Sequence, residues 1–181
     1  MQNLTLLEGK KFQITLERLC HQLIENHNDF SDTVILGIQP RGIYLSKRIA
    51  KELNNILPKH DVKNGILDIT FYRDDFRRGD SPLVPNSTQI DFIIEGKKVI
   101  LVDDVLWTGR TIRAAMDAML AFGRPAKVEL LVLVDRRYSR QLPIEPDYIG
   151  IKVDAISSQK VVVSWQEADQ NDKVILVSEN K

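Results

Sequence analysis

Hydrophobic residues recur at intervals of three and four in three stretches of the chain. These stretches are Lys10 to His27, Ile43 to Ile56 and Thr111 to Phe122. Such spacing places apolar side chains on one face of a helix, so we predict three amphipathic helices. Asn28 and Asp29 follow the first stretch and Gly123 follows the third, where residues of these types commonly end a helix.

Short apolar and β-branched runs lie between these helices and predict strands. In chain order they are residues 33–38, 65–72, 99–102, 128–134, 148–153, 161–165 and 174–177. Residues 90–94 alternate and predict a returning strand, and the last two runs predict a hairpin that turns at residues 169–172. Strands alternate with helices through the middle of the chain, so we predict an α/β fold with a mostly parallel central sheet flanked by helices.

Composition limits the classes of protein to consider. The chain has 181 residues, of which 43% are hydrophobic and 28% charged, and this fits a single domain over residues 1–181. The formal net charge is zero, so the whole molecule exerts no strong pull on nucleic acid or on an anionic membrane. No signal-peptide pattern and no long apolar run is present, so we expect a cytoplasmic protein without a membrane partner.

Two acids, Asp103 and Asp104, follow the apolar run 99–102. Ligands of open α/β sheets bind outside the carboxyl ends of the strands, which is where these acids are expected. The next turn, residues 108–111, leads into a predicted helix, whose free N–H groups and dipole attract phosphate. Acids for sugar hydroxyls followed by a phosphate-binding turn indicate a ribose 5-phosphate site. A plain strand, turn and capped helix with solvated acids is the alternative.

The segment from residue 99 to residue 111 resembles the phosphoribosyl pyrophosphate signature of type I phosphoribosyltransferases. Its longer form, with Val105, Leu106 and Arg110, is similar to the PyrR family, which couples uracil phosphoribosyltransferase activity with RNA-binding regulation of pyrimidine genes. Further similar segments are residues 18–21, 41–45, 68–75, 82–84, 123–125, 133–136 and 142–144. The resemblance implies the type I fold, with a flexible loop and a small hood formed by roughly residues 135–181 and the N-terminus.

The resemblance assigns two segments to phosphoribosyl pyrophosphate. One is the pyrophosphate loop with Pro40, Arg41 and Gly42, where a cis Gln39–Pro40 bond is expected because proline lowers its cost. The other consists of Asp103, Asp104, Val105, Leu106, Trp107, Thr108, Gly109, Arg110 and Thr111. Mg²⁺ is the implied cofactor, held through substrate and water rather than by direct protein ligands.

Residues Tyr72, Arg73, Asp74 and Asp75 resemble the start of the flexible loop, which runs to Pro85 and closes over the substrate to exclude water. The resemblance implies that Arg73 contacts the departing pyrophosphate. The catalytic candidates are therefore Asp103, Asp104 and Arg73.

Base recognition is expected in the hood. The candidates are backbone groups near Val134, Arg136, Arg137 and Val162. In this region the family usually reads Asp-Arg-Gly-His-Arg-Glu-Leu-Pro-Ile, whereas residues 135–144 are one residue longer and lack the Gly-His pair. The difference leaves the identity of the base open.

The expected reaction joins phosphoribosyl pyrophosphate to a pyrimidine base, with uracil as the first choice, giving UMP and pyrophosphate. One alternative is a nucleotide-sensing regulator that binds RNA, and another is transfer to a purine base. Basic residues that would serve an RNA surface are Arg18, Lys47, Arg48, Lys51, Arg136, Arg137 and Arg140. The resemblance also implies a homodimer or a homotetramer.

Overall fold

The structure is a computed structural model, and it describes residues 3–74, 87–156 and 158–178. Its strands are β1 (Asn3–Glu8), β2 (Thr33–Ile38), β3 (Asn64–Leu67), β4 (Lys98–Leu106), β5 (Lys127–Arg137), β6 (Tyr148–Asp154), β7 (Gln159–Ser164) and β8 (Lys173–Ser178). Its helices are α1 (Gly9–His27), α2 (Gly42–Ile56), α3 (Arg110–Met119) and α4 (Gln166–Asp169), with short 3₁₀ turns η1 (Thr70–Tyr72) and η2 (Leu120–Phe122).

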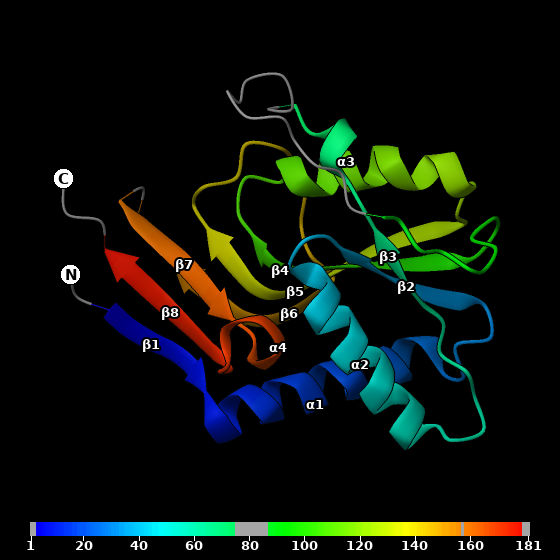
Figure 1. The fold of residues 1–181 in the computed structure, drawn as a ribbon, viewed down its shortest axis with the longest axis horizontal. Coiled ribbons are helices and arrows are strands. Elements are labelled where there is room, and N and C mark those ends of the chain that lie inside the picture. Colours follow the sequence, from blue (N-terminus) through cyan, green and yellow to red (C-terminus); the bar gives the residue numbers. More distant parts are fainter. Residues whose placement is uncertain (1–2, 75–86, 157, 179–181) are drawn as a thin grey trace.

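The larger sheet has five parallel strands in the order β3-β2-β4-β5-β6. Helices α1 and α2 cover one face of this sheet and α3 covers the other (Figure 1). This arrangement confirms the predicted α/β class. All three long helices also lie within about a residue or a turn of the predicted stretches, because each buries one apolar stripe against the sheet.

A second, antiparallel sheet lies beside the first and has the strand order β1-β8-β7 (Figure 1). The predicted C-terminal hairpin is confirmed as β7 and β8, with α4 between them. The sequence analysis does not predict strand β1, because its partner strand β8 comes from the other end of the chain. It pairs with β8 along residues 3–8, so the N-terminal segment completes this smaller sheet.

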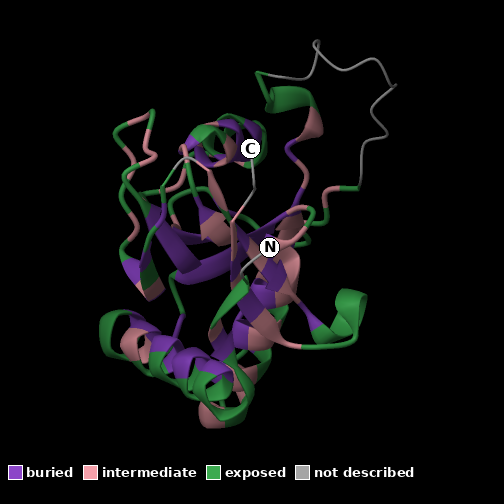
Figure 2. Ribbon diagram, turned by 90° about the vertical axis from the view of Figure 1, so that its left-hand side faces the viewer, coloured by how far each residue is buried: buried purple, intermediate pink, exposed green. Residues whose placement is uncertain are grey.

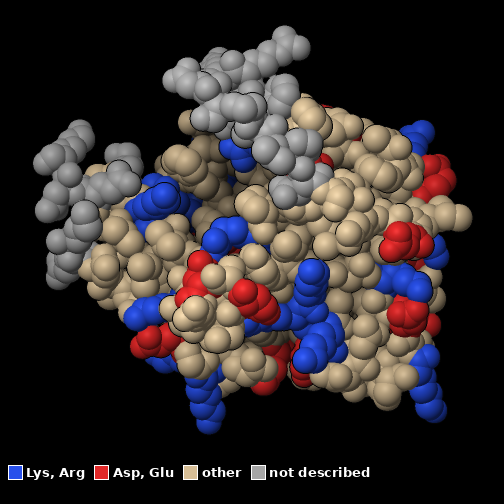
Figure 3. Space-filling view, viewed as in Figure 1, with Lys and Arg blue, Asp and Glu red and all other residues tan. Residues whose placement is uncertain are grey.

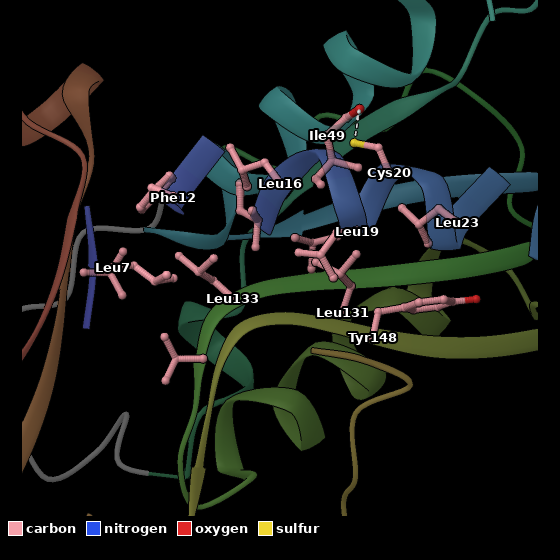
Figure 4. Close-up of a cluster of buried hydrophobic side chains, with 14 of the residues drawn as sticks. Leu7, Phe12, Leu16, Leu19, Cys20, Leu23, Ile49, Leu131, Leu133 and Tyr148 are labelled. Carbon is pink, nitrogen blue, oxygen red and sulfur yellow. Dashed lines mark hydrogen bonds between the residues drawn. The ribbon is translucent and has the colours of Figure 1, made fainter. Parts of the chain in front are cut away.

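The hydrophobic core lies on both faces of the larger sheet, and buried residues concentrate there (Figure 2). Side chains of α1 pack on β5 and β6, as Leu19 does against Leu131 and Leu133 (Figure 4). Cys20 is fully buried in this layer, with its sulfur 3.9 Å from the carbonyl oxygen of Ile49. Burial raises the pKa of the Cys20 thiol to about 12, so this cysteine is structural, as predicted.

Three predicted strands differ from the structure. The run 65–72 leaves the sheet after Leu67, and its end forms η1. Residues 90–94 form no strand, and the only pairing near them in the described residues is an isolated bridge between Gln89 and Ile66. In this segment Ile94 is fully buried, whereas Ile93 is 76% exposed. Strand β4 runs past residue 102 to Leu106, since its last residues still pair with β5. No helix in the described part of the chain is long and apolar enough to span a bilayer.

Candidate active site

The acid pair lies within β4 rather than beyond it. Asp103 is only 7% exposed and pairs with Val132 of β5, so the peptide backbone at the carboxylates is held in the sheet. The Oδ1 atom of Asp103 accepts a hydrogen bond of 2.9 Å from the backbone N–H of Asp104. Pairing with β5 therefore fixes the backbone that carries both carboxylates, near the carboxyl ends of the parallel strands.

Burial governs the charge of this pair. It raises the pKa of Asp103 well above its ordinary value, and the negative charge of Asp104 adds to the effect. Burial also raises the pKa of Asp104, against the opposing charge of Arg41, whose Nε lies 3.7 Å from Oδ2 of Asp104. Burial thus disfavours the negative charge of the pair, and ligand groups that donate hydrogen bonds, such as sugar hydroxyls, stabilise it.

The loop after β4 turns directly into α3. Gly109 has a φ of 92°, in the left-handed region that favours glycine, and it is the N-cap of α3. Its carbonyl oxygen accepts a hydrogen bond of 3.0 Å from Arg113 N–H, which starts the helix. The start of a helix, with its free N–H groups, therefore follows the acid pair within a few residues, as a phosphate site requires.

The loop between β2 and α2 approaches the acid pair from the other side. Its Gln39–Pro40 bond is cis, as expected from the sequence. Gly42, the first residue of α2, touches β4 so closely that an added Cβ would lie 2.4 Å from Val102 O. Arg41 stands just before it and donates a 2.7 Å hydrogen bond to Val163 O of β7 and another to Asp169.

One cavity of about 660 Å³ joins these segments. The predicted residues that line it are Arg41, Asp103, Asp104, Val105, Leu106, Trp107, Thr108, Gly109, Thr111, Arg136 and Val162. Pro40, Gly42 and Arg110 flank it without lining it. The cavity also has lining residues that the sequence analysis does not identify, which are Ile112, Gln159, Lys160, Val161, Val163, Ser164 and Asp169. The sequence predicts only a hairpin turn for residues 169–172, and nothing local in it places Asp169 beside Arg41.

The predicted base-contacting residues divide into two groups. Arg136 is 5% exposed, its guanidinium lies 5.0 Å from the centre of the Trp107 ring, and Nη2 donates a 3.0 Å bond to Ile156 O. It lines the cavity, as Val162 does. Val134 is buried in the main sheet, paired with Val105 and Ile151, so it does not reach the cavity.

Arg137 also lies away from the cavity. It forms a bidentate ion pair with Asp154, with distances of 2.6 and 2.7 Å. The extension of β5 explains this placement, because successive residues of a strand point to opposite faces. Arg136 and Arg137 therefore face different surroundings, a distinction that the shorter predicted strand concealed.

The start of the predicted flexible loop lies against α3. Tyr72 ends η1, and its carbonyl oxygen accepts a 3.1 Å hydrogen bond from Arg113. Asp74 forms an ion pair with Arg110. The positive charge of Arg73 lowers the pKa of Asp103 against the effect of burial, which places Arg73 within electrostatic reach of the acid pair. Asp75 and the rest of this loop to Pro85 lie outside the described residues.

Comparison with known proteins identifies the class defined by this fold and site. The chain belongs to the phosphoribosyl transferase domain family, whose model matches residues 2–169. Solved structures with the same fold include a hypoxanthine phosphoribosyltransferase of Trypanosoma cruzi (TM-score 0.71, 14% identity, 97% of each chain). Another is a hypoxanthine phosphoribosyltransferase of Staphylococcus aureus (TM-score 0.69, 19% identity, covering 98% of this chain and 92% of that one).

Within this class the chain is a member of the PyrR family. It is 47% identical over 171 residues to the bifunctional protein PyrR of Desulfosudis oleivorans, covering 94% of this chain and 93% of that protein. It is 44% identical over 178 residues to the protein of the same name in Bacillus subtilis, covering 97% of each. The predicted resemblance is confirmed, and the protein is a glycosyltransferase-type enzyme of the phosphoribosyltransferase kind.

Proposed function

We propose that the protein transfers the phosphoribosyl group of phosphoribosyl pyrophosphate to uracil, giving UMP and pyrophosphate. The observation that carries this proposal is the convergence of a buried acid pair, the start of α3 and Arg41 on one cavity. The PyrR name of the relatives supports the choice of a pyrimidine base.

Each wall of the cavity has a role in this reaction. Asp103 and Asp104 accept hydrogen bonds from the ribose hydroxyls, while the N–H groups of residues 108–111 hold the 5′-phosphate. As pyrophosphate leaves, positive charge develops on the sugar ring, and the nearby carboxylates stabilise it. Arg41 meets the diphosphate from the opposite side.

Magnesium fits these residues as a substrate-bound ion. Among residues 3–74, 87–156 and 158–178, no group of three or more His, Cys, Asp or Glu side chains is arranged to hold a metal ion directly. Mg²⁺ keeps several waters and binds diphosphate oxygens readily, so Asp103 and Asp104 would meet it through water and sugar hydroxyls. When bound, it neutralises the charge of the leaving diphosphate.

The remaining assignments belong to the same proposal. Arg73 contacts the departing pyrophosphate, and the loop that begins at Tyr72 closes over the substrate. The base lies against Arg136 and Val162. The chain forms one phosphoribosyltransferase domain, of which the three-stranded sheet is the hood. A homodimer or homotetramer and a cytoplasmic location stay predictions.

Product formation with a panel of bases tests the function. Purified protein with phosphoribosyl pyrophosphate and Mg²⁺ is offered uracil, orotate, hypoxanthine, guanine and xanthine, and nucleotide formation is followed by chromatography. We expect UMP formation to dominate. Preference for hypoxanthine or guanine would favour the purine alternative. The solved structures named above share only the fold with this chain, so they do not decide between the bases.

The acid pair is tested in the same assay. The double variant Asp103→Asn and Asp104→Asn should lose about 100-fold or more in kcat/KM for phosphoribosyl pyrophosphate, because both charge-stabilising acceptors are weakened. Near-normal turnover of this variant would remove the pair from the mechanism.

A further inference from the structure

The side chain of Arg41 lines the cavity and reaches from the loop before α2 to the smaller sheet. Its Nη2 atom donates to Val163 O at 2.7 Å and to the carboxylate of Asp169, while Nε lies 3.7 Å from Asp104. In the described residues both side-chain hydrogen bonds of Arg41 leave from Nη2. The guanidinium therefore stands between two acids, one in β4 and one at the end of α4.

Asp169 is itself held by the core. Its Oδ2 atom accepts a 2.9 Å hydrogen bond from Trp165 N–H, and its own N–H donates a 2.7 Å bond to Trp165 O. Trp165 is fully buried and packs edge-on against Phe12, with ring centres 5.6 Å apart. The bond from Trp165, together with Arg41, holds the pKa of Asp169 below its ordinary value, so the carboxylate is charged at neutral pH.

Neighbouring acids on the same segment serve a different purpose. Glu167 and Asp172 both pair with Arg48 of α2, at 2.7 Å each, and the Arg48 guanidinium lies 5.1 Å from the centre of the Trp165 ring. These pairs fasten α4 to α2, and neither acid lines the cavity. Asp169 lines it and pairs with Arg41, which also approaches Asp104.

The arrangement has a consequence for substrate binding. Without Asp169, Arg41 would be drawn toward the remaining acid, Asp104, and would compete with the sugar hydroxyls for it. A free arginine side chain also loses much rotamer freedom when it is fixed on a ligand, and this loss weakens binding. An arginine already fixed by Asp169 and Val163 O avoids both effects.

We propose that Asp169 is a positioning residue, which keeps the Arg41 guanidinium from closing on Asp104 in a direct hydrogen bond and holds it ready for the diphosphate of the incoming sugar. This inference rests on the proposed function, because that function gives Arg41 a diphosphate to bind. Asp169 acts through Arg41 and makes no contact with the reacting atoms.

A double-mutant cycle tests the inference. Asp169→Ala should raise KM for phosphoribosyl pyrophosphate about tenfold and change kcat by less than about twofold, because the lost interaction serves binding rather than the chemical step. Arg41→Ala should raise KM by a similar or larger factor. Adding Asp169→Ala to Arg41→Ala should then have little further effect.

Matched variants separate positioning from structure. Asp169→Asn keeps an oxygen for Trp165 N–H and Arg41, so its KM should lie between those of the wild type and Asp169→Ala. Glu167→Ala removes an acid from the same turn but leaves Arg41 untouched, and it should lower thermal stability without raising KM. Thermal melting of every variant records stability alongside the kinetics.

Two outcomes would overturn the inference. Additive effects of Arg41→Ala and Asp169→Ala would mean that Asp169 does not act through Arg41. An equal rise in KM for Glu167→Ala would reduce Asp169 to a structural residue of the turn. Failure of the proposed function is distinct from both, since the wild type itself would then form no nucleotide from any base.

Discussion

Asp103 occupies a position that opposes its own ionisation. It is buried in β4, beside a second carboxylate, and burial raises its pKa well above its ordinary value. A folded-state pKa above the unfolded value means that the folded protein binds the proton more tightly. As pH rises from the ordinary value of 3.8 through the raised pKa, the free energy of unfolding therefore falls. The role proposed for Asp103 in substrate binding therefore accompanies a lower stability of the folded protein.

Asp103→Asn should accordingly stabilise the protein at neutral pH while it impairs activity. The amide removes the buried charge but keeps an oxygen that accepts from Asp104 N–H. We expect a melting temperature about 2–4 °C higher at pH 7.5, which corresponds to roughly 1 kcal/mol for a chain of this size. The gain should shrink toward pH 4, and calorimetry over this range measures it. A gain that is independent of pH would contradict the electrostatic explanation.

Gly42 sets the distance between α2 and the acid pair. An added Cβ would lie 2.4 Å from Val102 O and 2.9 Å from Asp103 Cα, so Gly42→Ala must push the pyrophosphate loop away from β4. We expect a loss of ~1–3 kcal/mol in stability and a higher KM for phosphoribosyl pyrophosphate. Chemical denaturation and steady-state kinetics measure the two effects.

Gly150 offers a matched control for this substitution. Its added Cβ would lie 2.4 Å from Leu133 O, the same separation from a backbone oxygen, but Gly150 lies in β6 and does not line the cavity. Gly150→Ala should therefore lose stability without a change in KM. If both variants raise KM equally, general loosening of the sheet is the cause. The hypothesis that Gly42 acts by setting the distance between α2 and the acid pair would then be wrong.

At the scale of elements, strongly periodic segments could be predicted from the sequence and strand ends could not. The apolar stripe of α1 predicts its boundaries to within a residue, because that helix buries one continuous face. The sequence predicts that β4 ends at residue 102, since the two acids that follow are typical of the start of a loop. Pairing with β5 continues to Leu106, and only the neighbouring strand supplies that information. Strand β1 likewise depends on β8, from the other end of the chain.

A buried polar network joins α1, β2, β5 and β6 near the N-terminal ends of these strands, away from the cavity. His27 of α1 contacts Thr33 Oγ1 at 3.1 Å, Tyr148 OH at 3.0 Å and Glu129 Oε2 at 2.8 Å. Lys127 also pairs with Glu129, and Lys98 and Asp32 lie close enough to act on His27. Burial lowers the pKa of His27 below 6.5 despite the attraction of Glu129. The histidine is therefore neutral in the folded protein at neutral pH.

The contribution of His27 to stability should fall on mild acidification, opposite in sign to that of Asp103. Below pH 6.5 the unfolded chain takes up a proton on His27 that the folded protein resists, so the free energy of unfolding of the wild type should fall relative to that of a variant without His27. The Glu129 pKa is held below 4.5, so Glu129 contributes only at lower pH. Urea unfolding at pH 7.5, 6.5 and 5.5 should show a steeper decline for the wild type than for His27→Gln. The exposed His21→Gln variant serves as the control, with a profile like that of the wild type.

At the scale of the whole molecule, the candidate site was predictable in its contiguous part. Residues 103–111 form one segment, so their chemistry is visible in the sequence. Asp169 is far from Arg41 along the chain, and the two meet only because the smaller sheet packs beside the larger one. The Arg136 contact with Trp107 depends in the same way on the length of β5. Contacts between distant segments require the fold, whereas motifs within a segment do not.

The charge distribution bears on the RNA-binding alternative. On the face seen in Figure 3, basic and acidic side chains are interspersed. Arg48 pairs with Glu167 and Asp172, and Arg137 pairs with Asp154. Arg140 is held by Asp135, Arg136 is buried, and Arg18 donates to Ile149 O and Gly150 O. Of the seven basic residues considered for RNA, Lys47, Lys51 and Arg18 are exposed and have no acidic partner among the described residues.

RNA binding by this protein should therefore be weak and nonspecific. Three cations without acidic partners neutralise about three phosphates, so on single-stranded RNA the logarithm of the binding constant should fall with the logarithm of salt concentration with a slope near −2. Filter binding with a pyrimidine-gene leader RNA and a scrambled RNA, each with and without UMP, measures affinity at several salt concentrations. We expect equal weak affinity for both RNAs and no response to UMP, with a flatter slope for the double variant Lys47→Ala and Lys51→Ala. Tight, UMP-dependent binding of the leader alone would establish the regulator, because the paired arginines would then have to exchange their acidic partners for phosphates.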